Sequence, residues 1–217
     1  MAAVKLPRPL VIGHRGFPSR YPDNSLEGIA AALELGADGV EVDIRMCAEG
    51  AWVCHHDLRR AGRPVRSWPL SVLAAEGVPS VVEAAALLPA QAWLFLEIKP
   101  LPRRELESGL AELVRLVRPR LARTMVISSS PSVLKVVGGA LPGAGRSWVV
   151  SRIPPTPALP GVSLSPHHTL LEQLAGWGVP LHPWTVNRVE RMRVVAGMGA
   201  ASLTTNRPDL AVEVFGD

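Results

Sequence analysis

Short apolar runs alternate with helical patterns along the whole 217-residue chain, and this alternation decides which folds are open to it. Eight of the runs are expected to be strands, at residues 10–13, 39–44, 92–98, 125–128, 147–150, 162–164, 180–184 and 201–204. Residues 51–55 are expected to add a hairpin strand, because Glu49 and Gly50 offer a turn before them. Strands that alternate with helices predict a parallel sheet, and eight is the number that closes a barrel.

Apolar residues at helical spacing predict helices in several of the intervals between strands. These stripes cover residues 26–33, 106–117, 170–177 and 189–195. Asn24 with Glu27 is expected to form an N-cap box for the first of these helices, and Asn187 with Glu190 repeats the pattern before the last. The proline-rich segment 153–161 is expected to be a surface loop.

The pattern favours an α/β fold, a (β/α)8 TIM barrel with a small β-hairpin insertion after the second strand. An open doubly wound sheet is the alternative. In that fold a glycine-rich phosphate loop follows the first strand, whereas this chain has His14-Arg15-Gly16 there. No repeat or linker divides the sequence, so residues 1–217 are expected to form a single domain.

The charge of the chain does not indicate a nucleic-acid partner, although the formal net charge is +4. The arginines are scattered, and one Tyr and three Phe are too few for basic and aromatic residues to interleave. No apolar run approaches the roughly 20 residues that span a bilayer, so stable membrane anchoring is not expected. The chain shows no signal-peptide pattern, so it is expected to be cytoplasmic, where Cys47 and Cys54 stay reduced.

Two acidic residues, Glu41 and Asp43, occupy alternate positions near the end of the second expected strand. Residues two apart on a strand point to the same face, so both carboxylates project together between apolar neighbours. Their mutual repulsion requires a cation nearby, and a hard divalent metal ion is a natural candidate. On this motif alone, a pair of structural salt bridges at the strand end is an equally good interpretation.

Glu97 and Lys99 repeat this spacing at the end of the third expected barrel strand, whose earlier residues are apolar. Lys99 is one of only three lysines in a chain with 23 basic residues. A lysine in such an arginine-rich sequence suggests that a compact point charge is needed at this position. The alternative is an ordinary solvated lysine.

Two histidines accompany these groups. His14 ends the first strand and is followed by Arg15, while His56 follows the hairpin strand. If they converge, these residues offer an acid, a base and a clamp for an anionic phosphate. The C-terminal ends of the expected parallel strands, where barrel enzymes build their active sites, carry six of these polar and aromatic residues: His14, Glu41, Asp43, Glu97, Lys99 and Trp184. His55 has the opposite strand parity from His56 and is expected to point away.

In their order along the chain, these motifs resemble those of the glycerophosphodiester phosphodiesterases. The matching segments are Gly13-His14-Arg15-Gly16, Pro22-Asp23-Asn24-Ser25, residues 36–43, His56-Asp57, Glu97-Ile98-Lys99, Trp184-Thr185-Val186-Asn187 and Thr205-Asn206-Arg207-Pro208. They span nearly the whole chain, and members of that family fold as (β/α)8 barrels. The resemblance implies a phosphoric diester hydrolase that uses a divalent metal ion. Mg or Ca is expected, with Mn as a further option, because an oxygen-only ligand set does not favour zinc.

The resemblance also implies a role for each matching residue. The metal ligands would be Glu41, Asp43 and Glu97, and the general acid and base would be His14 and His56. Arg15 and Lys99 would bind the phosphodiester, and Trp184 would form the wall on the glycerol side. The expected reaction is hydrolysis of a small-molecule glycerophosphodiester to sn-glycerol 3-phosphate and an alcohol. The assignment of acid and base, the alcohol and the oligomeric state are not predicted.

Three differences from the family pattern bear on the site. Asp23 stands where the family usually has Glu, and Ser129-Ser130 replaces a usual Ser-Phe, which removes an aromatic wall. The segment 57–80 is short, so any lid over the site is expected to be small or absent. Two other functions are alternatives: a related phospholipase D-type enzyme that acts on lysophospholipids, and a catalytically idle barrel that binds phosphorylated ligands.

Overall fold

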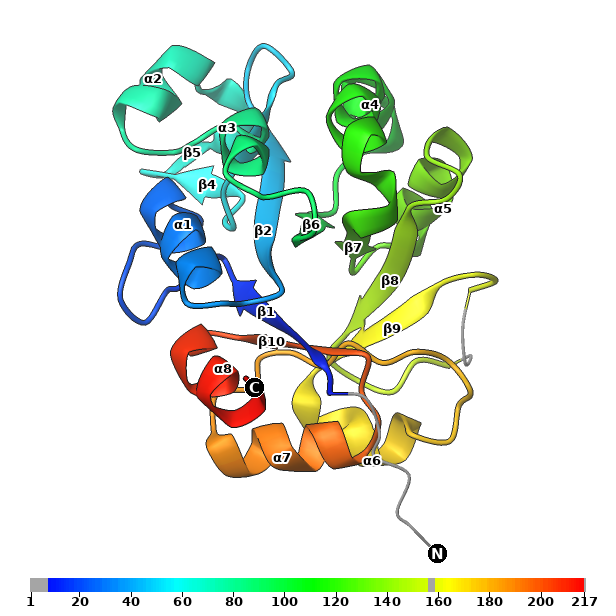
Figure 1. Cartoon of the computed structure of the whole chain (residues 1–217). Helices are drawn as coiled ribbons and strands as arrows, with labels where there is room; N and C mark the ends of the chain where they lie inside the picture. The colour runs from blue at the N-terminus through cyan, green and yellow to red at the C-terminus, as the bar shows by residue number, and fades with distance from the viewer. Residues whose placement is uncertain (1–7, 156–158, 217) are drawn as a thin grey trace, which may run out of the picture.

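The structure, a computed structural model, describes residues 8–155 and 159–216 (Figure 1). Among these residues, seven parallel strands lie side by side in the order β10-β1-β2-β6-β7-β8-β9. Their bounds are β1 Leu10–His14, β2 Gly39–Met46, β6 Trp93–Ile98, β7 Thr124–Ser128, β8 Gly145–Val150, β9 Ser163–Pro166 and β10 Ser202–Thr205. This order and the parallel pairing confirm seven of the eight predicted barrel strands.

Residues 180–186 lie between β9 and β10 and close the barrel. On one side the backbone N of His182 donates to Leu164 O (2.8 Å), and on the other Thr204 N donates to Pro183 O (3.0 Å). Pro183 itself has no N–H group to donate, so a continuous ladder does not form here. The eighth strand position, predicted at 180–184, is therefore filled by irregular backbone that still bridges both neighbours.

Helices follow most of the strands and cover the outside of the barrel (Figure 1). They are α1 Leu26–Glu34, α3 Val81–Ala86, α4 Arg103–Val117, α5 Pro131–Ala140, α6 Leu171–Leu174, α7 Val189–Gly197 and α8 Pro208–Phe215, with 3-10 turns at Arg118–Arg123 and His168–Leu170. The helix expected at 170–177 is shorter than predicted: it ends at Leu174, ahead of Gly176, a residue that disfavours helix. No helix in the described residues combines the length and apolar character needed to cross a membrane.

Two of the three apolar clusters among the described residues follow from the two faces of each strand, and the third belongs to the insertion after β2. Residues that point outward from the strands, such as Val40 and Val42, pack with the helices in one large cluster. Residues that point inward, such as Ile12 and Phe95, form a smaller cluster with Met125 and Ile127 inside the barrel. The smaller cluster fills the barrel interior and leaves the polar strand ends above it.

The insertion after β2 begins with β3 (Trp52–Cys54), which pairs antiparallel with β2 as predicted. A second hairpin follows, formed by β4 (Arg59–Arg60) and β5 (Arg63–Pro64). A 3-10 turn at Val65–Ser67 and helix α2 (Leu70–Ala75) complete the insertion. Cys47 and Cys54 are buried free thiols. The proline-rich loop expected at 153–161 lies partly outside the described residues, and its described part belongs to no helix or strand.

Both predicted capping boxes are wrong. Ser25 caps α1, its hydroxyl accepting from the backbone N of Gly28 (3.2 Å), while Asn24 has a φ of 60°, unsuited to the extended conformation of an N-cap. Asn187 does not cap α7; its Oδ1 accepts from the backbone N of Asn206 (2.9 Å). Both asparagines are used to fix loops at the C-terminal edge of the barrel.

Candidate active site

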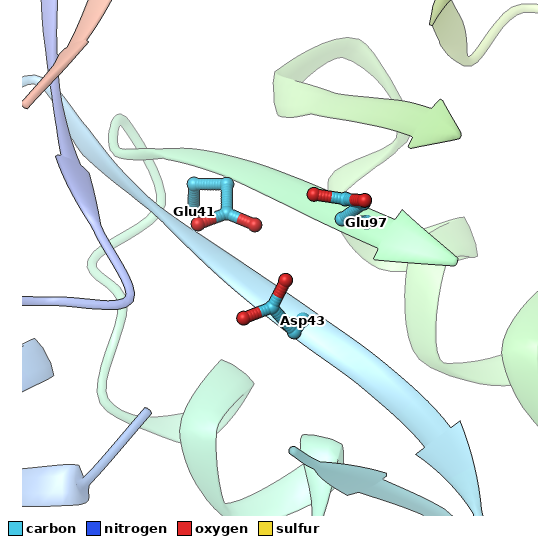
Figure 2. Close-up of side chains that lie close together, drawn as sticks. All are labelled: Glu41, Asp43 and Glu97. Carbon is cyan, nitrogen blue, oxygen red and sulfur yellow. The ribbon is translucent and has the colours of Figure 1, made fainter. Parts of the chain in front are cut away.

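Three carboxylates from two neighbouring strands come together at the C-terminal edge of the barrel (Figure 2). Glu41 and Asp43 lie on the same face of β2, and Asp43 is in register with Glu97 on β6. One oxygen atom from each residue lies within 4.8 Å of the others. Glu41 and Asp43 are only 1% and 0% exposed. Alternation along β2 and the register with β6 therefore build the acidic cluster that the sequence predicts.

Burial of Glu41, with Asp43 and Glu97 beside it, raises the pKa of its carboxyl group well above the usual value. Its Oε2 accepts a hydrogen bond from the backbone N of Arg15 (3.1 Å). Its Oε1 is buried and has no hydrogen-bond partner in the part of the chain that the structure describes. A buried carboxylate oxygen without a donor, inside an all-oxygen cluster, suits a hard divalent cation. The three carboxylates therefore fit such an ion.

Lys99 lies against the same cluster. Its Nζ is 2.6 Å from Asp43 Oδ1 and 2.7 Å from Glu97 Oε1. Burial lowers the pKa of the lysine, but the two carboxylates outweigh burial and raise it. For Asp43 the directions are reversed. Burial raises the pKa of its carboxyl group, but the positive charges of Lys99 and Arg15 outweigh burial and hold that pKa below the usual range. The alternative of an ordinary solvated lysine is therefore excluded, because this ammonium is buried and doubly paired.

Arg15 links two acidic residues at the turn between β1 and α1. Its Nε is 3.0 Å from Asp43 Oδ2, and its Nη1 donates to Asp23 Oδ2 at 2.5 Å. The backbone turns back sharply here, since Arg15 and Gly16 have φ values of 52° and 87°. Only glycine suits the second position, because a Cβ on Gly16 would lie 2.6 Å from the backbone of Gly28. Asp23 contacts Arg15 although its side chain is one methylene shorter than the Glu that the family usually has at this position.

Each of the two predicted histidines is fixed through one ring nitrogen. His14 Nδ1 donates to Asn206 Oδ1 (2.6 Å), and His56 Nδ1 donates to Asp57 Oδ1 (2.8 Å), so Nε2 of each ring takes no part in these hydrogen bonds. Burial, with a smaller contribution from Arg15, lowers the pKa of His14 to about 4. The side chain of His56 is 42% exposed, so it lies at the mouth of the site.

A pocket of about 340 Å³ opens over the acidic cluster. Seven of the eight predicted site residues line it: His14, Arg15, Glu41, His56, Glu97, Lys99 and Trp184. Asp43, the eighth, is buried and contacts both Lys99 and Arg15. The indole Nε1 of Trp184 donates to Ser165 O (2.8 Å), which fixes the ring on the wall formed by residues 180–186. His55 lines a different cavity, as its strand parity predicts.

Sequence reasoning missed a buried histidine in the pocket wall, His182. Its Nδ1 forms a hydrogen bond with Ser202 Oγ (2.8 Å), and its ring meets that of Phe95 edge-on at 5.8 Å between centroids. Burial lowers its pKa to about 4. The available signal was its position two residues before Trp184, where strand alternation places both side chains on one face.

Comparisons with known proteins agree with this geometry. The model of the glycerophosphoryl diester phosphodiesterase family matches residues 14–108. A glycerophosphodiester phosphodiesterase of Caldanaerobacter subterraneus subsp. tengcongensis is 26% identical, over 94% of this chain and 97% of its own. The similarity therefore extends along nearly the full length of both proteins.

Two solved structures share the fold. A glycerophosphodiester phosphodiesterase from Parabacteroides distasonis has a TM-score of 0.82 at 24% identity, covering 96% of this chain and 97% of its own. A phosphodiesterase from Oleispira antarctica, in complex with the product sn-glycerol-3-phosphate, has a TM-score of 0.83 at 20% identity, covering 98% of each chain. The structural similarity thus covers nearly the full length of each of these chains.

The barrel, its site and these relatives define the chain as a phosphoric diester hydrolase. The match of the family model to residues 14–108 and the full-length similarity to the Caldanaerobacter enzyme confirm the resemblance to the glycerophosphodiester phosphodiesterases found in the sequence motifs.

Proposed function

We propose that this enzyme hydrolyses glycerophosphodiesters to sn-glycerol 3-phosphate and an alcohol, with a divalent metal ion held by Glu41, Asp43 and Glu97. The observation that carries the proposal is the buried Oε1 of Glu41, which has no hydrogen-bond partner among the described residues and faces two further carboxylates. The sn-glycerol-3-phosphate in the Oleispira antarctica complex supports the choice of product.

Two cations of the pocket are placed to hold the phosphodiester. Arg15 and Lys99 both line the pocket and both contact Asp43, so their charged groups are fixed beside the acidic cluster. When bound, a divalent ion supplies polarisation of the phosphoryl oxygens and stabilises the charge that develops on them. Trp184 bounds the opposite wall, where its fixed ring offers an apolar surface to the glycerol carbons.

His14 and His56 perform the proton transfers. One Nε2 accepts the proton of the nucleophile, which is water or the neighbouring hydroxyl of the glycerol, and the other donates a proton to the leaving alkoxide. The hydrogen bonds from each Nδ1, to Asn206 and to Asp57, fix the ring orientation and the tautomer. Replacing Asn206 or Asp57 would therefore disturb the proton transfers without touching the metal ligands.

The proposal is tested by release of sn-glycerol 3-phosphate from glycerophosphocholine by the purified protein, with Mg, Ca or Mn and with chelator. We expect release that depends on the ion and that Glu41→Gln abolishes. Glu213→Gln is the matched control, because Glu213 is an exposed carboxylate on α8 and does not line the pocket.

The same assay separates the alternatives. No release from several glycerophosphodiesters with any ion would contradict the proposal. Hydrolysis of lysophosphatidylcholine in place of the soluble diesters would establish the phospholipase D-type activity. Binding of sn-glycerol 3-phosphate without turnover of either substrate would indicate a catalytically idle barrel.

A further inference from the structure

A second cavity, of about 330 Å³, lies beside the reaction pocket. The two share Lys99, which lines both. They are also joined through Arg45, which lines the second cavity and whose Nε donates to the backbone O of His56 (2.9 Å). A substrate whose phosphate lies over the acidic cluster can therefore extend one of its halves into this cavity.

The second cavity is lined by both apolar and positively charged side chains. Its charged residues are Arg45, Arg59, Arg66, Lys99 and Glu105. Arg66 is paired with Glu105 (2.9 Å), and Lys99 is paired with the carboxylates of the acidic cluster. In the described part of the chain, Arg45 and Arg59 form no ion pair; their side chains donate only to the backbone oxygens of His56 and Gly62.

Arg45 is placed on the same strand face as the acidic cluster. It follows Asp43 by two residues on β2, so strand alternation directs both side chains to one face, with Arg45 further toward the mouth. The residue is half-buried, so its charge is only partly screened by water. An anionic group bound next to the phosphate would give this guanidinium the partner that the chain does not supply.

A third cavity, of about 420 Å³, also borders the site, but both of its arginines are already paired with carboxylates. It contains three carboxylates, and each has a partner within the cavity wall. Asp23 is paired with Arg15 (2.5 Å), Glu76 with Arg60 (2.7 Å) and Asp57 with the His56 ring (2.8 Å). This cavity therefore offers no unpaired guanidinium to an anionic ligand, because its two arginines, Arg15 and Arg60, are both paired, in contrast to the arginine-lined cavity.

We propose that the arginine-lined cavity binds the alcohol half of the substrate, and that the enzyme prefers glycerophosphodiesters whose alcohol carries a negative charge. This inference rests on the proposed function, and it names the substrate class for that function. Trp184, on the glycerol side, lines the reaction pocket and does not line the arginine-lined cavity. The glycerol half of the diester therefore lies against Trp184, and the alcohol half lies in the arginine-lined cavity. A cationic alcohol such as choline would meet repulsion from Arg45 and Arg59.

The test compares kcat/KM for three diesters that share the glycerophosphoryl half. Glycerophosphocholine has a cationic alcohol, glycerophosphoglycerol a neutral one, and bis(glycerophospho)glycerol an alcohol with an anionic phosphodiester. We expect the anionic substrate to exceed glycerophosphocholine by about tenfold at low salt after correction for its two equivalent ends, with a smaller ratio at high salt.

Charge reversal at Arg59 tests the location. Arg59→Glu is expected to lower the ratio of anionic to cationic substrate by about fivefold or more. Arg63→Glu is the matched control: it lies on the same exposed hairpin and makes the same charge change, but Arg63 stacks on Trp68 and does not line the cavity. The control should change the ratio by less than about twofold, because its charge is farther from the alcohol.

Arg45 is tested through the same ratio, since its contact with His56 affects all substrates equally. Arg45→Gln should lower the ratio and Arg45→Lys should retain most of it. Equal kcat/KM values for the three diesters, a preference for glycerophosphocholine, or equal effects of Arg59→Glu and Arg63→Glu would each overturn the inference and leave the proposed function standing. No hydrolysis of any diester would overturn the proposed function, and this inference with it.

Discussion

Asn24 forms a two-point hydrogen bond with Asp43. Its Nδ2 donates to Asp43 Oδ2 (3.1 Å), and its Oδ1 accepts from the backbone N of Asp43 (3.0 Å). Both residues are buried, and they are 19 positions apart in the sequence. The Asn24 side chain therefore ties the loop after β1 to the strand that carries two of the carboxylates, and it fixes the orientation of Asp43.

Replacing Asn24 by Ala should lower the free energy of unfolding by about 1–3 kcal/mol, because two buried polar groups of Asp43 lose a partner. Alanine also suits the left-handed backbone at this position (φ 60°) less well than asparagine does. Urea denaturation measures the loss, and the affinity for the metal ion, measured in parallel, should weaken. Unchanged stability and unchanged metal affinity would show that Asp43 is oriented without Asn24.

Glu41→Gln should lower hydrolysis at least about 100-fold without unfolding the chain, because a ligand is lost while the shape is kept. The variant should also change the pH dependence of stability in chelator. The folded-state pKa of Glu41 is raised above its ordinary 4.5, so its contribution is present below that pH and is lost as the pH rises toward the folded pKa. The stability of the wild type relative to Glu41→Gln, measured by thermal unfolding, should therefore fall from pH 4 to pH 8. Near wild-type turnover would refute the ligand assignment.

His182 should make the protein less stable in mild acid. Burial lowers its folded-state pKa to about 4, below the ordinary 6.5, so the unfolded chain binds the proton first. Stability from the neutral ring is complete above pH 6.5 and is lost as the pH falls toward 4, by at most about 3 kcal/mol. His182→Gln should flatten this part of the stability curve in urea titrations. Parallel curves for the two proteins would show that His182 does not remain neutral.

Gly16→Ala should destabilise the fold strongly, by about 3 kcal/mol, because a Cβ there would lie 2.6 Å from the backbone of Gly28 in addition to the cost of its positive φ. Gly62→Ala is the matched control. Gly62 also has a positive φ, of 76°, but a Cβ there would meet nothing within 4 Å, so the expected loss is about 1 kcal/mol. Equal losses in urea denaturation would show that the close packing of the β1–α1 turn is not limiting.

The barrel and most of the candidate site could be predicted because buried residues recur along the sequence with the period of the helix or strand that they belong to. Val40 and Val42 pack outward against helices while Glu41 and Asp43 point into the barrel, and this alternation is visible in the residues alone. The strand end then marks the site, since parallel strands bring their C-terminal residues to one edge.

The remaining features of the site depend on which side chains, distant in the sequence, come into contact. Local sequence patterns do not predict those contacts. Asn24 matches an N-cap pattern as well as it matches a partner for Asp43, and only the fold selects the second. The contact of His14 with Asn206 spans 192 positions. The arginine-lined cavity likewise arises from an insertion, a strand and a loop whose charges look scattered along the chain.

The contacts of Lys99 with Asp43 and Glu97 have a consequence for the order of assembly. The ammonium is a counter-ion built into the polypeptide, and it neutralises part of the acidic cluster as soon as β2 and β6 pair. Folding of the barrel therefore need not wait for a divalent ion from solution. Under the proposed function, the supply of that ion would govern how many molecules are active while leaving the number of folded molecules nearly constant.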